Sequence, residues 1–284
     1  MSVFPRLFKY LSPDGIDLLV NRRLKVTPLS VFNDVFEFRP VIQDQIQPEL
    51  IESLGQSDNI LREIYRKGKS DGVINGSFAQ FAAEYQRSVG QNKSAIADAA
   101  TQLIRREVAK WPDKLCMQYG VVCLSAVRDC ELMWAHYAQY HRGLVVELDI
   151  SGLPDVDLRL VHYSQDRPTL DLSVVQDAQL VAEAGDRLLW TKSIKWKYER
   201  EWRAKIPKRC LETDGAVDTS SVYLLLPPEA IRSVIIGIRT NEDLRDRVVR
   251  AMDTPDLKHA SCLQACMHET DFKIVIHKLK PGDN

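Results

Sequence analysis

The richest group of charged and aromatic side chains lies at residues 195–203, Lys-Trp-Lys-Tyr-Glu-Arg-Glu-Trp-Arg. If a strand begins near Glu199, then Glu199, Glu201 and Arg203 share one face, because side chains alternate along a strand. Two carboxylates beside an arginine suit work on a cationic or oxocarbenium-like centre, where one carboxylate holds a sugar hydroxyl and a neighbouring group handles the proton. The alternative interpretation is a strand held by salt bridges, with its tryptophans in the core.

A second aromatic segment covers residues 133–141, Met-Trp-Ala-His-Tyr-Ala-Gln-Tyr-His. On a helix Met133 and Tyr137 fall near one face, and Trp134 lies close to them. Such a stripe is typical of core packing, and the functional alternative is a platform that stacks on a flat ligand ring. His136 lies beside that platform, where a hydrogen-bonded structural role is the simpler interpretation.

A third segment, residues 32–37, reads Phe-Asn-Asp-Val-Phe-Glu. Asn33 and Asp34 stand between aromatic residues, and their side chains are suited to bonding the local backbone and fixing a turn. Contact with a ligand is the second interpretation of this pair.

Well-known nucleotide, hydrolase and metal motifs do not occur in the sequence. It holds no G-x-x-x-x-G-K-[ST], G-x-G-x-x-G, H-E-x-x-H or G-x-S-x-G pattern, which argues against a P-loop enzyme, a Rossmann dehydrogenase and an α/β-hydrolase. Cys262, Cys266 and His268 have strand-like spacing, with His259 nearby, but a zinc site needs a second ligand pair in a turn. We therefore predict no metal.

Composition points to a soluble protein of 284 residues, enough for one large domain or two small ones. Lysine and arginine number 38 against 39 acidic residues, which argues against a protein that coats DNA non-specifically, although a local basic groove is compatible with this balance. No apolar run reaches the roughly 18 residues of a membrane helix. The N-terminus does not resemble a signal peptide, and six scattered cysteines favour reduced thiols in the cytoplasm.

Hydrophobic periodicity predicts an α+β fold, because strands and helices alternate without a regular βαβ rhythm. We predict a single domain over 1–284, with a helical insertion at about 45–112 broken at Gly55 and near 70–76. The other predicted helices are 128–140, 175–190 and 241–252. The predicted strands are 7–10, 24–26, 121–125, 144–150, 160–163, 201–206, 234–238 and two within 258–279.

Four of these segments together resemble a bacterial family recorded only as a domain of unknown function. The family opens with an aromatic-Lys/Arg-Tyr strand, here 7–10, and continues with F-N-D-P-F-E, here 32–37 with Val35 in place of proline. An L-M-W-x-H-Y-A-x-x-H-x-G segment follows at 132–143, and W-x-Y-E-x-E-W-R at 196–203. The matches come in order and span about residues 6–206.

The layout is also similar, more distantly, to the ADP-ribosyltransferase superfamily. Those enzymes use a His or Arg on an early strand, a Tyr or Ser in the middle and a late Glu within E-x-E. Lys9 takes the early position here, Tyr137 the middle one and Glu201 the late one, with Glu199 two residues before it. The resemblance implies a mixed, mainly antiparallel, split β-sheet and NAD as the substrate.

The same resemblance implies roles for individual residues. Glu201 would bind the 2′-hydroxyl of the nicotinamide ribose and stabilise positive charge on that ring, with Glu199 and Tyr137 as further catalytic residues. Tyr137 or Trp134 would stack on nicotinamide, while Lys9 and Arg203 would hold the pyrophosphate. The remaining predicted ligand-binding residues are Tyr10, Asn33, Asp34 and His136.

Three functions compete on this evidence. The first is an NAD-consuming transferase or glycohydrolase of the toxin or anti-phage kind, with a protein or nucleic acid as acceptor. The second is a magnesium-dependent nuclease, in which Asp186, the acidic pair and Arg203 or Lys205 approximate a D…E-x-K arrangement. The third is a non-catalytic ligand-sensing module whose aromatic clusters are core. The first requires Glu201 and Tyr137 to face one cavity lined by cationic groups.

Overall fold

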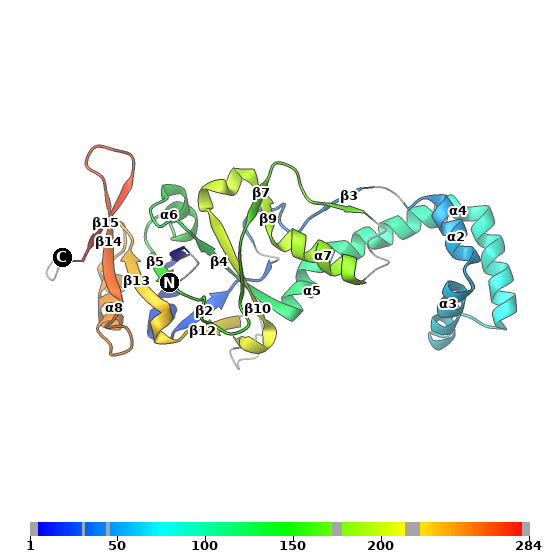
Figure 1. Ribbon diagram of the computed structural model, residues 1–284, viewed down its shortest axis with the longest axis horizontal. Coiled ribbons are helices and arrows are strands. Elements are labelled where there is room, and N and C mark those ends of the chain that lie inside the picture. Colours follow the sequence, from blue (N-terminus) through cyan, green and yellow to red (C-terminus); the bar gives the residue numbers. More distant parts are fainter. Residues whose placement is uncertain (1–4, 30–31, 44–45, 172–177, 214–221, 280–284) are drawn as a thin grey trace. The chain divides into compact units, whose positions relative to one another are not determined.

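The computed structural model describes residues 5–29, 32–43, 46–171, 178–213 and 222–279 (Figure 1). The chain divides into two compact units. The first unit consists of 1–38, 112–167 and 189–284, and the second of 39–111 and 168–188. The predicted insertion at about 45–112 lies almost wholly in the second unit, which also includes the later segment 168–188.

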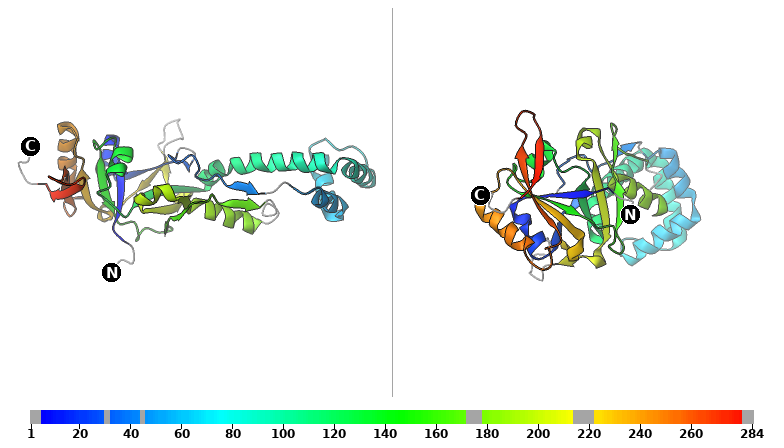
Figure 2. Two further views of the ribbon diagram at one scale, coloured as in Figure 1. Left: turned by 90° about the horizontal axis from the view of Figure 1, so that it is seen from above. Right: turned by 60° about the vertical axis from the view of Figure 1, so that its left-hand side comes forward.

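A mixed eight-stranded β-sheet is the centre of the first unit (Figures 1 and 2). Neighbouring strands are antiparallel throughout, except that β13 and β14 are parallel. This confirms the predicted α+β class with a mostly antiparallel sheet. In spatial order the strands are β15 (Ile274–Lys278), β14 (Ser261–Met267), β13 (Ile231–Ile236), β5 (Leu144–Leu148), β1 (Leu7–Leu11), β4 (Tyr119–Ser125), β10 (Glu201–Pro207) and β6 (Asp157–Leu160).

Shorter elements surround this sheet. A three-stranded sheet and a two-stranded one contribute β11 (Glu212–Thr213), β12 (Val222–Leu225), β2 (Arg23–Val26), β7 (His162–Ser164) and β9 (Thr191–Ser193). The α-helices are α1 (Asp17–Val20), α5 (Trp111–Gln118), α6 (Glu131–Tyr137) and α8 (Glu242–Met252). The 3₁₀-helices are η1 (Pro13–Ile16), η4 (Ile194–Glu199), η5 (Lys208–Cys210) and η6 (Pro228–Ala230).

The large sheet is nearly split between β1 and β4. Strand β1 pairs with β5 along its whole length, and β4 pairs with β10 along its whole length. Among the described residues, however, β1 and β4 pair only through Phe8 and Ser125. Beyond that pair the two strands separate, and the Lys9 ammonium reaches across to the Cys123 carbonyl oxygen at 3.0 Å. The separation leaves room between two otherwise continuous halves of the sheet.

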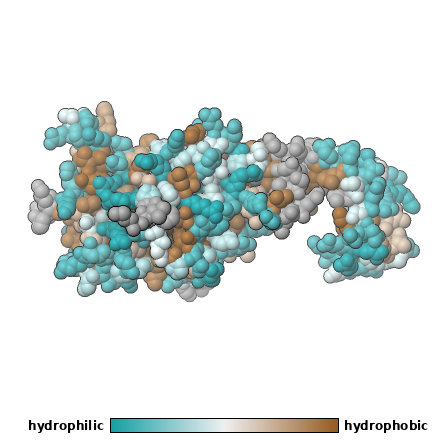
Figure 3. Space-filling model, in the orientation of Figure 1, coloured by the Kyte–Doolittle hydropathy of each residue, from teal (hydrophilic) through white to brown (hydrophobic). Residues whose placement is uncertain are grey.

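Each face of the sheet has its own hydrophobic core. On one face, side chains such as Leu7 and Val146 pack with apolar residues of α1 and α8. On the other, Phe8 and Val145 pack with Trp134 of α6. Burial of this apolar surface supplies most of the stabilisation of such a core. The outer face of α8 is hydrophilic, as its amphipathic sequence predicts (Figure 3).

The turn after α6 is conformationally unusual. The predicted helix 128–140 is only 131–137 in the structure, because Gln139, Tyr140 and His141 all have left-handed backbone angles, with φ of 46°, 56° and 69°. Gly143, which follows these three residues, packs so closely against β1 that an added Cβ would lie 1.9 Å from the Leu11 carbonyl oxygen. The turn therefore fixes the end of α6 against β1.

The second unit is mainly helical. Its elements are β3 (Val41–Gln43), α2 (Pro48–Gln56), α3 (Asp58–Ser70), α4 (Phe78–Ala109), β8 (Thr169–Asp171) and α7 (Ala178–Leu189). The predicted breaks near Gly55 and 70–76 are confirmed as helix ends. Ser77 caps α4 in a reciprocal capping box with Gln80, which explains why that helix begins there. None of the helices in the described ranges combines the length and apolar character of a membrane span.

Candidate functional site

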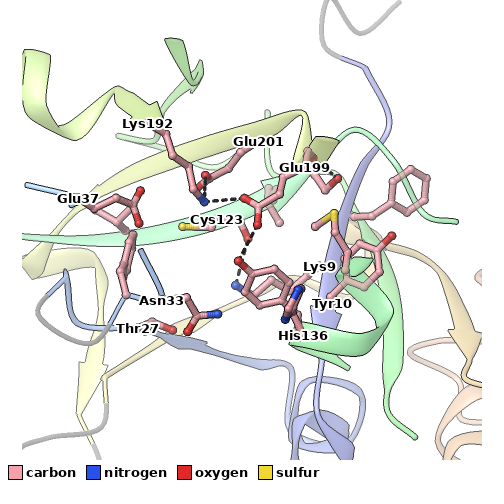
Figure 4. A pocket seen from close by; sticks show the side chains of 17 residues that line it. Lys9, Tyr10, Thr27, Asn33, Glu37, Cys123, His136, Lys192, Glu199 and Glu201 are labelled. Carbon is pink, nitrogen blue, oxygen red and sulfur yellow. Dashed lines mark hydrogen bonds and ion pairs between the residues drawn. The ribbon is translucent and has the colours of Figure 1, made fainter. Parts of the chain in front are cut away.

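A cavity of about 280 Å³ lies where β1 and β4 separate (Figure 4). Its walls come from these two strands, from α6, from the turn before Glu37 and from the segment 192–201. The lining residues are Phe8, Lys9, Tyr10, Thr27, Phe32, Asn33, Glu37, Val121, Cys123, Leu124, Ser125, Met133, His136, Tyr137, Lys192, Glu199 and Glu201.

A buried lysine joins the two predicted catalytic carboxylates. The Lys192 ammonium donates to Glu199 Oε2 at 2.5 Å and to Glu201 Oε2 at 2.8 Å. Glu199 and Glu201 are 2% and 3% exposed, and Lys192 is 7% exposed. Charged groups this deeply buried need partners of opposite charge. The acidic pair is therefore held in place by the lysine (Figure 4).

Arg203 supports the acidic pair from outside the cavity. Its Nε donates to Glu201 Oε1 at 2.8 Å, and its Nη1 donates to the Leu189 carbonyl at 2.6 Å. Its Nη2 also pairs with Glu37, the last residue of the F-N-D-x-F-E segment. The side chain is fully buried and does not line the cavity. The expectation that Arg203 binds a pyrophosphate is therefore corrected: it positions Glu201 and Glu37.

The backbone around the acidic pair differs from the predicted strand. Residues 194–199 form η4, and β10 begins at Glu201 rather than Glu199. Between them Arg200 has a left-handed conformation, with φ of 44°. This turn aims both carboxylates at Lys192 even though they do not lie on one strand. The Ser125 hydroxyl donates to the Glu199 carbonyl at 2.6 Å, and the Glu201 N–H donates to Tyr163 Oη at 2.7 Å.

The electrostatics keep Glu201 ionised. Burial raises its pKa, but the charges of Arg203 and Lys192 and their hydrogen bonds outweigh burial and hold the pKa at about 2. The pKa of Glu37 is raised, because burial outweighs the charge of Arg203. Burial lowers the pKa of Lys192, yet its three carboxylate neighbours raise it overall. The site and its immediate surroundings thus contain equal numbers of acidic and basic side chains, namely Glu37, Glu199 and Glu201 against Lys9, Lys192 and Arg203.

Tyr137 forms the aromatic wall above the carboxylates. Its hydroxyl donates to Glu199 Oε1 at 2.6 Å and receives a hydrogen bond from the Asn33 side chain. Burial and the charge of Glu199 raise the pKa of Tyr137, so the phenol stays protonated. The exposed His136 lies at its edge, with ring centroids 6.3 Å apart. Tyr137, Asn33 and His136 thus all line the cavity, and their contacts with a ligand stay a prediction.

The first strand supplies the opposite wall. Lys9 and Tyr10 line the cavity, and the Tyr10 hydroxyl donates to the Val127 carbonyl at 3.1 Å. Tyr10 packs edge-on against Trp134, with ring centroids 5.6 Å apart. Trp134 is fully buried and its indole N–H donates to the Arg128 carbonyl at 2.9 Å. The expectation that Trp134 stacks on a ligand is therefore corrected: its ring belongs to the core.

Asp34 also lies outside the cavity lining. Its Oδ1 accepts a hydrogen bond from the Phe36 N–H at 2.9 Å, so the side chain fixes the turn that carries Asn33 and Glu37. This agrees with the structural interpretation of Asp34. Lys192, Glu37 and Cys123 also line the cavity, although the sequence patterns did not predict them as site residues. Of these three residues, only Glu37 stood in a segment that the sequence patterns had marked, since it ends the aromatic segment 32–37.

The arrangement differs from the proposed nuclease. A lysine ammonium occupies the position between the two carboxylates, and the Lys205 ammonium lies 3.9 Å from Asp157 Oδ2. Within the described ranges, no group of three or more histidine, cysteine or acidic side chains is arranged to hold a metal ion. His268 Nδ1 instead accepts hydrogen bonds from the backbone of its own turn.

Comparisons with known proteins reach only part of the chain. No curated protein and no solved structure matches it significantly. A family model does match, over the segment that runs from Met133 on α6 to Ala204 on β10 and carries Tyr137, Lys192 and the acidic pair. Over residues 133–204 the chain is therefore confirmed as similar to a family described as "Protein of unknown function (DUF2971)", the kind of family that its motifs predicted.

Proposed function

We propose that the protein is an NAD-consuming enzyme of the ADP-ribosyltransferase-like kind, a transferase or an NAD glycohydrolase. One observation carries the proposal: Glu201, ionised and 3% exposed, faces the same cavity as the Tyr137 ring. A carboxylate held in a dry, fixed position stabilises positive charge far better than one in water. The near-split sheet between β1 and β4 also fits the resemblance that suggested this chemistry.

The reaction needs such a carboxylate. The bond between the ribose C1′ and the nicotinamide nitrogen breaks, nicotinamide leaves with the bonding electrons, and positive charge develops on the ribose ring. Glu201 would accept a hydrogen bond from the ribose 2′-hydroxyl and stabilise that charge. An acceptor then forms a bond to C1′ and loses a proton. Tyr137 would face the nicotinamide ring, and its protonated hydroxyl keeps Glu199 in place.

The direct test is release of nicotinamide from NAD. We expect the wild-type protein to release it and Glu201→Gln to lower the rate at least 100-fold, because one such electrostatic contact contributes about 10²–10³ to a rate. Glu147→Gln is the matched control. Glu147 is also a buried carboxylate of the first unit, bonded to Arg6 Nη2 at 2.5 Å and Ser233 Oγ at 2.7 Å, but outside this cavity.

Two results would contradict the proposal. Equal rates for wild type and Glu201→Gln would remove Glu201 from the mechanism. Absence of nicotinamide release by a folded wild-type protein, over a range of pH and NAD concentrations, would remove the activity. Circular dichroism of each variant shows whether a lost rate reflects a lost fold.

A ligand-sensing module is the second candidate, and one observation favours it. Each charged side chain of the buried cluster already has an internal partner: Lys192 joins both members of the acidic pair, and Arg203 joins Glu201 and Glu37. Such a site can bind a polar ring without transforming it. Calorimetric binding of NAD without nicotinamide release would support this function over the first.

We propose the cytoplasm as the location, because NAD is available there and all six cysteines are free thiols. Consumption of NAD would make the protein a toxin or an anti-phage effector, as its resemblance suggests. Slow growth of bacteria that express the wild type, but not of those that express Glu201→Gln, is the expected result.

A further inference from the structure

Two of the three carboxylates that line the cavity have donors on both of their oxygens. The Tyr137 hydroxyl donates to Glu199 Oε1 at 2.6 Å, and the Lys192 ammonium donates to Glu199 Oε2 at 2.5 Å. On Glu201, Arg203 Nε donates to Oε1 at 2.8 Å, and Lys192 donates to Oε2, also at 2.8 Å. Glu201, with a pKa of about 2, is also a weak base. The proton that an acceptor loses when it bonds to C1′ therefore needs another group.

The third carboxylate, Glu37, has one oxygen without a donor. Arg203 Nη2 donates to Glu37 Oε1, and among the described residues nothing donates to Oε2. A carboxylate has about four lone-pair sites, so Glu37 can accept a further hydrogen bond without losing its arginine. Glu37 lines the same cavity as Glu201, and its side chain is 3% exposed. A group bound in the cavity can therefore donate to Glu37.

One guanidinium nitrogen fixes how far Glu37 lies from Glu201. Arg203 Nη2 donates to Glu37 Oε1 and also lies 3.2 Å from Glu201 Oε2. Two oxygens that share a nitrogen can be no farther apart than the sum of the two hydrogen bonds, which is roughly 6 Å. Enzymes that cleave glycosidic bonds place two carboxylates roughly 5–9.5 Å apart around the reacting carbon. The separation of Glu37 and Glu201 fits such a pair, and Figure 4 shows both side chains beside the Lys192 ammonium.

The surroundings of Glu37 make it a stronger base than Glu201. Burial raises the pKa of Glu37 and the charge of Glu201 raises it further, and together they outweigh the opposite effects of the two cations, Arg203 and Lys192. The same cations hold the pKa of Glu201 at about 2. A general base works best when its pKa lies close to the operating pH. Glu37 is therefore better suited to take a proton, while Glu201 stays ionised.

We infer that Glu37 is a second catalytic residue, the general base that takes the proton of the acceptor as the acceptor bonds to C1′. The inference rests on the proposed NAD-consuming function and applies to any acceptor that carries an O–H or N–H. In this step the glycosidic C–N bond breaks and nicotinamide leaves with the electron pair. A lone pair of the acceptor forms the new bond to C1′. The acceptor's proton passes to the Glu37 carboxylate, which afterwards releases it to solvent.

Glu37→Gln tests the base, because its amide keeps an oxygen that can accept from Arg203. We expect kcat for nicotinamide release to fall about 100-fold, within the usual contribution of a general base, with little change in KM. Glu147→Gln, which alters another buried carboxylate bonded to an arginine, is the matched control and should keep the wild-type rate. An unchanged kcat for Glu37→Gln overturns the inference.

Azide distinguishes a base from a residue that only holds Arg203 in place. Azide is a nucleophile with no proton to lose, so it needs no base when it bonds to C1′. We expect added azide to raise nicotinamide release by Glu37→Gln about 10-fold, with ADP-ribosyl azide as the product. Azide should leave Glu201→Gln inactive, because that variant fails at bond cleavage. A loss of rate in Glu37→Gln that azide does not restore overturns the role of Glu37 as base.

The pH dependence of the wild type needs no variant. A base must be ionised to take a proton, so kcat should fall as the pH decreases through the pKa of Glu37, which lies above the usual 4.5. Three other charged groups act on this carboxylate, and over that range Arg203 and Lys192 stay cationic while Glu201 stays anionic. Absence of this fall in the wild type, or its persistence in Glu37→Gln, overturns the inference alone. No nicotinamide release by the folded wild type overturns the proposed function, and the inference with it.

Discussion

Removal of the Lys192 charge tests the buried network most directly. In Lys192→Met the acidic pair loses the ammonium that lies 2.5 Å from Glu199 and 2.8 Å from Glu201. Breaking a buried ion pair by removing one partner costs about 3–5 kcal/mol. We expect the free energy of unfolding to fall by about 4 kcal/mol, since both carboxylates are almost fully buried.

A double-mutant cycle with Glu199→Gln separates the charge effect from lost packing. Glu199→Gln alone should cost about 2 kcal/mol, because Lys192 keeps Glu201 as a partner. If the two losses were additive, the double variant would lose about 6 kcal/mol. We expect a loss of only about 4 kcal/mol, because without Lys192 the Glu199→Gln change removes a charge that has no counter-ion. The expected coupling is therefore about 2 kcal/mol.

Urea unfolding followed by tryptophan fluorescence suits this measurement, because four of the five tryptophans, Trp134, Trp190, Trp196 and Trp202, belong to the first unit. Lys205→Met is the control. Lys205 lies on β10, but it is partly exposed and its ammonium is 3.9 Å from Asp157, so we expect a loss below about 1 kcal/mol. If the stability losses of the two single variants sum to that of the double variant within about 0.5 kcal/mol, then Lys192 and Glu199 are not coupled and the buried network is refuted as the basis of the site.

Three further predictions concern single residues. Folding lowers the pKa of Glu201 from 4.5 to about 2, so its contribution to stability is present above pH 4.5 and is lost as the pH falls toward 2. Between pH 5 and pH 3 the free energy of unfolding of the wild type should therefore fall by about 2 kcal/mol relative to that of Glu201→Gln in urea titrations. Equal pH dependence of the two proteins would contradict this prediction. Tyr137→Phe should lower stability by about 1–2 kcal/mol in the same assay, because Glu199 Oε1 loses its hydrogen-bond donor. An unchanged urea midpoint would show that this hydrogen bond contributes nothing to stability. Tyr140→Gly should raise stability by up to about 1 kcal/mol in thermal unfolding, because glycine adopts a left-handed backbone conformation without the strain of a side chain. Little packing is lost, since the Tyr140 side chain is 63% exposed. A lower Tm would mean that the turn is unstrained.

The main strands of the fold could be predicted from the sequence. Strand β5 was recognisable because four of its five residues are apolar and two of these are valines, and all five are buried in the structure. Strand β10 was recognisable by alternation, but its start was not. The left-handed angle at Arg200 breaks the alternation, and no glycine or asparagine marks that position.

The candidate site was predictable where residues form local patterns. Tyr137 and the acidic pair stand in dense polar and aromatic segments, and these segments proved to meet at one cavity. Trp134 and Tyr137 differ by three positions on a short helix, so the sequence could not distinguish the core side from the cavity side. Lys192 was missed because an isolated lysine is normally a solvated surface residue, and only the fold brings it between two carboxylates.

The order in which the site residues occur along the chain has a consequence for synthesis. Lys9 and Glu37 lie in the first 40 residues, whereas Lys192 and Glu201 come more than 150 residues later. A nascent polypeptide that ends before Lys192 lacks the acidic pair and both of its cationic partners, and one that ends before Arg203 still lacks the arginine. The buried charge network can therefore form only once synthesis has passed Arg203, and shorter nascent chains leave Glu37 without its cationic partner.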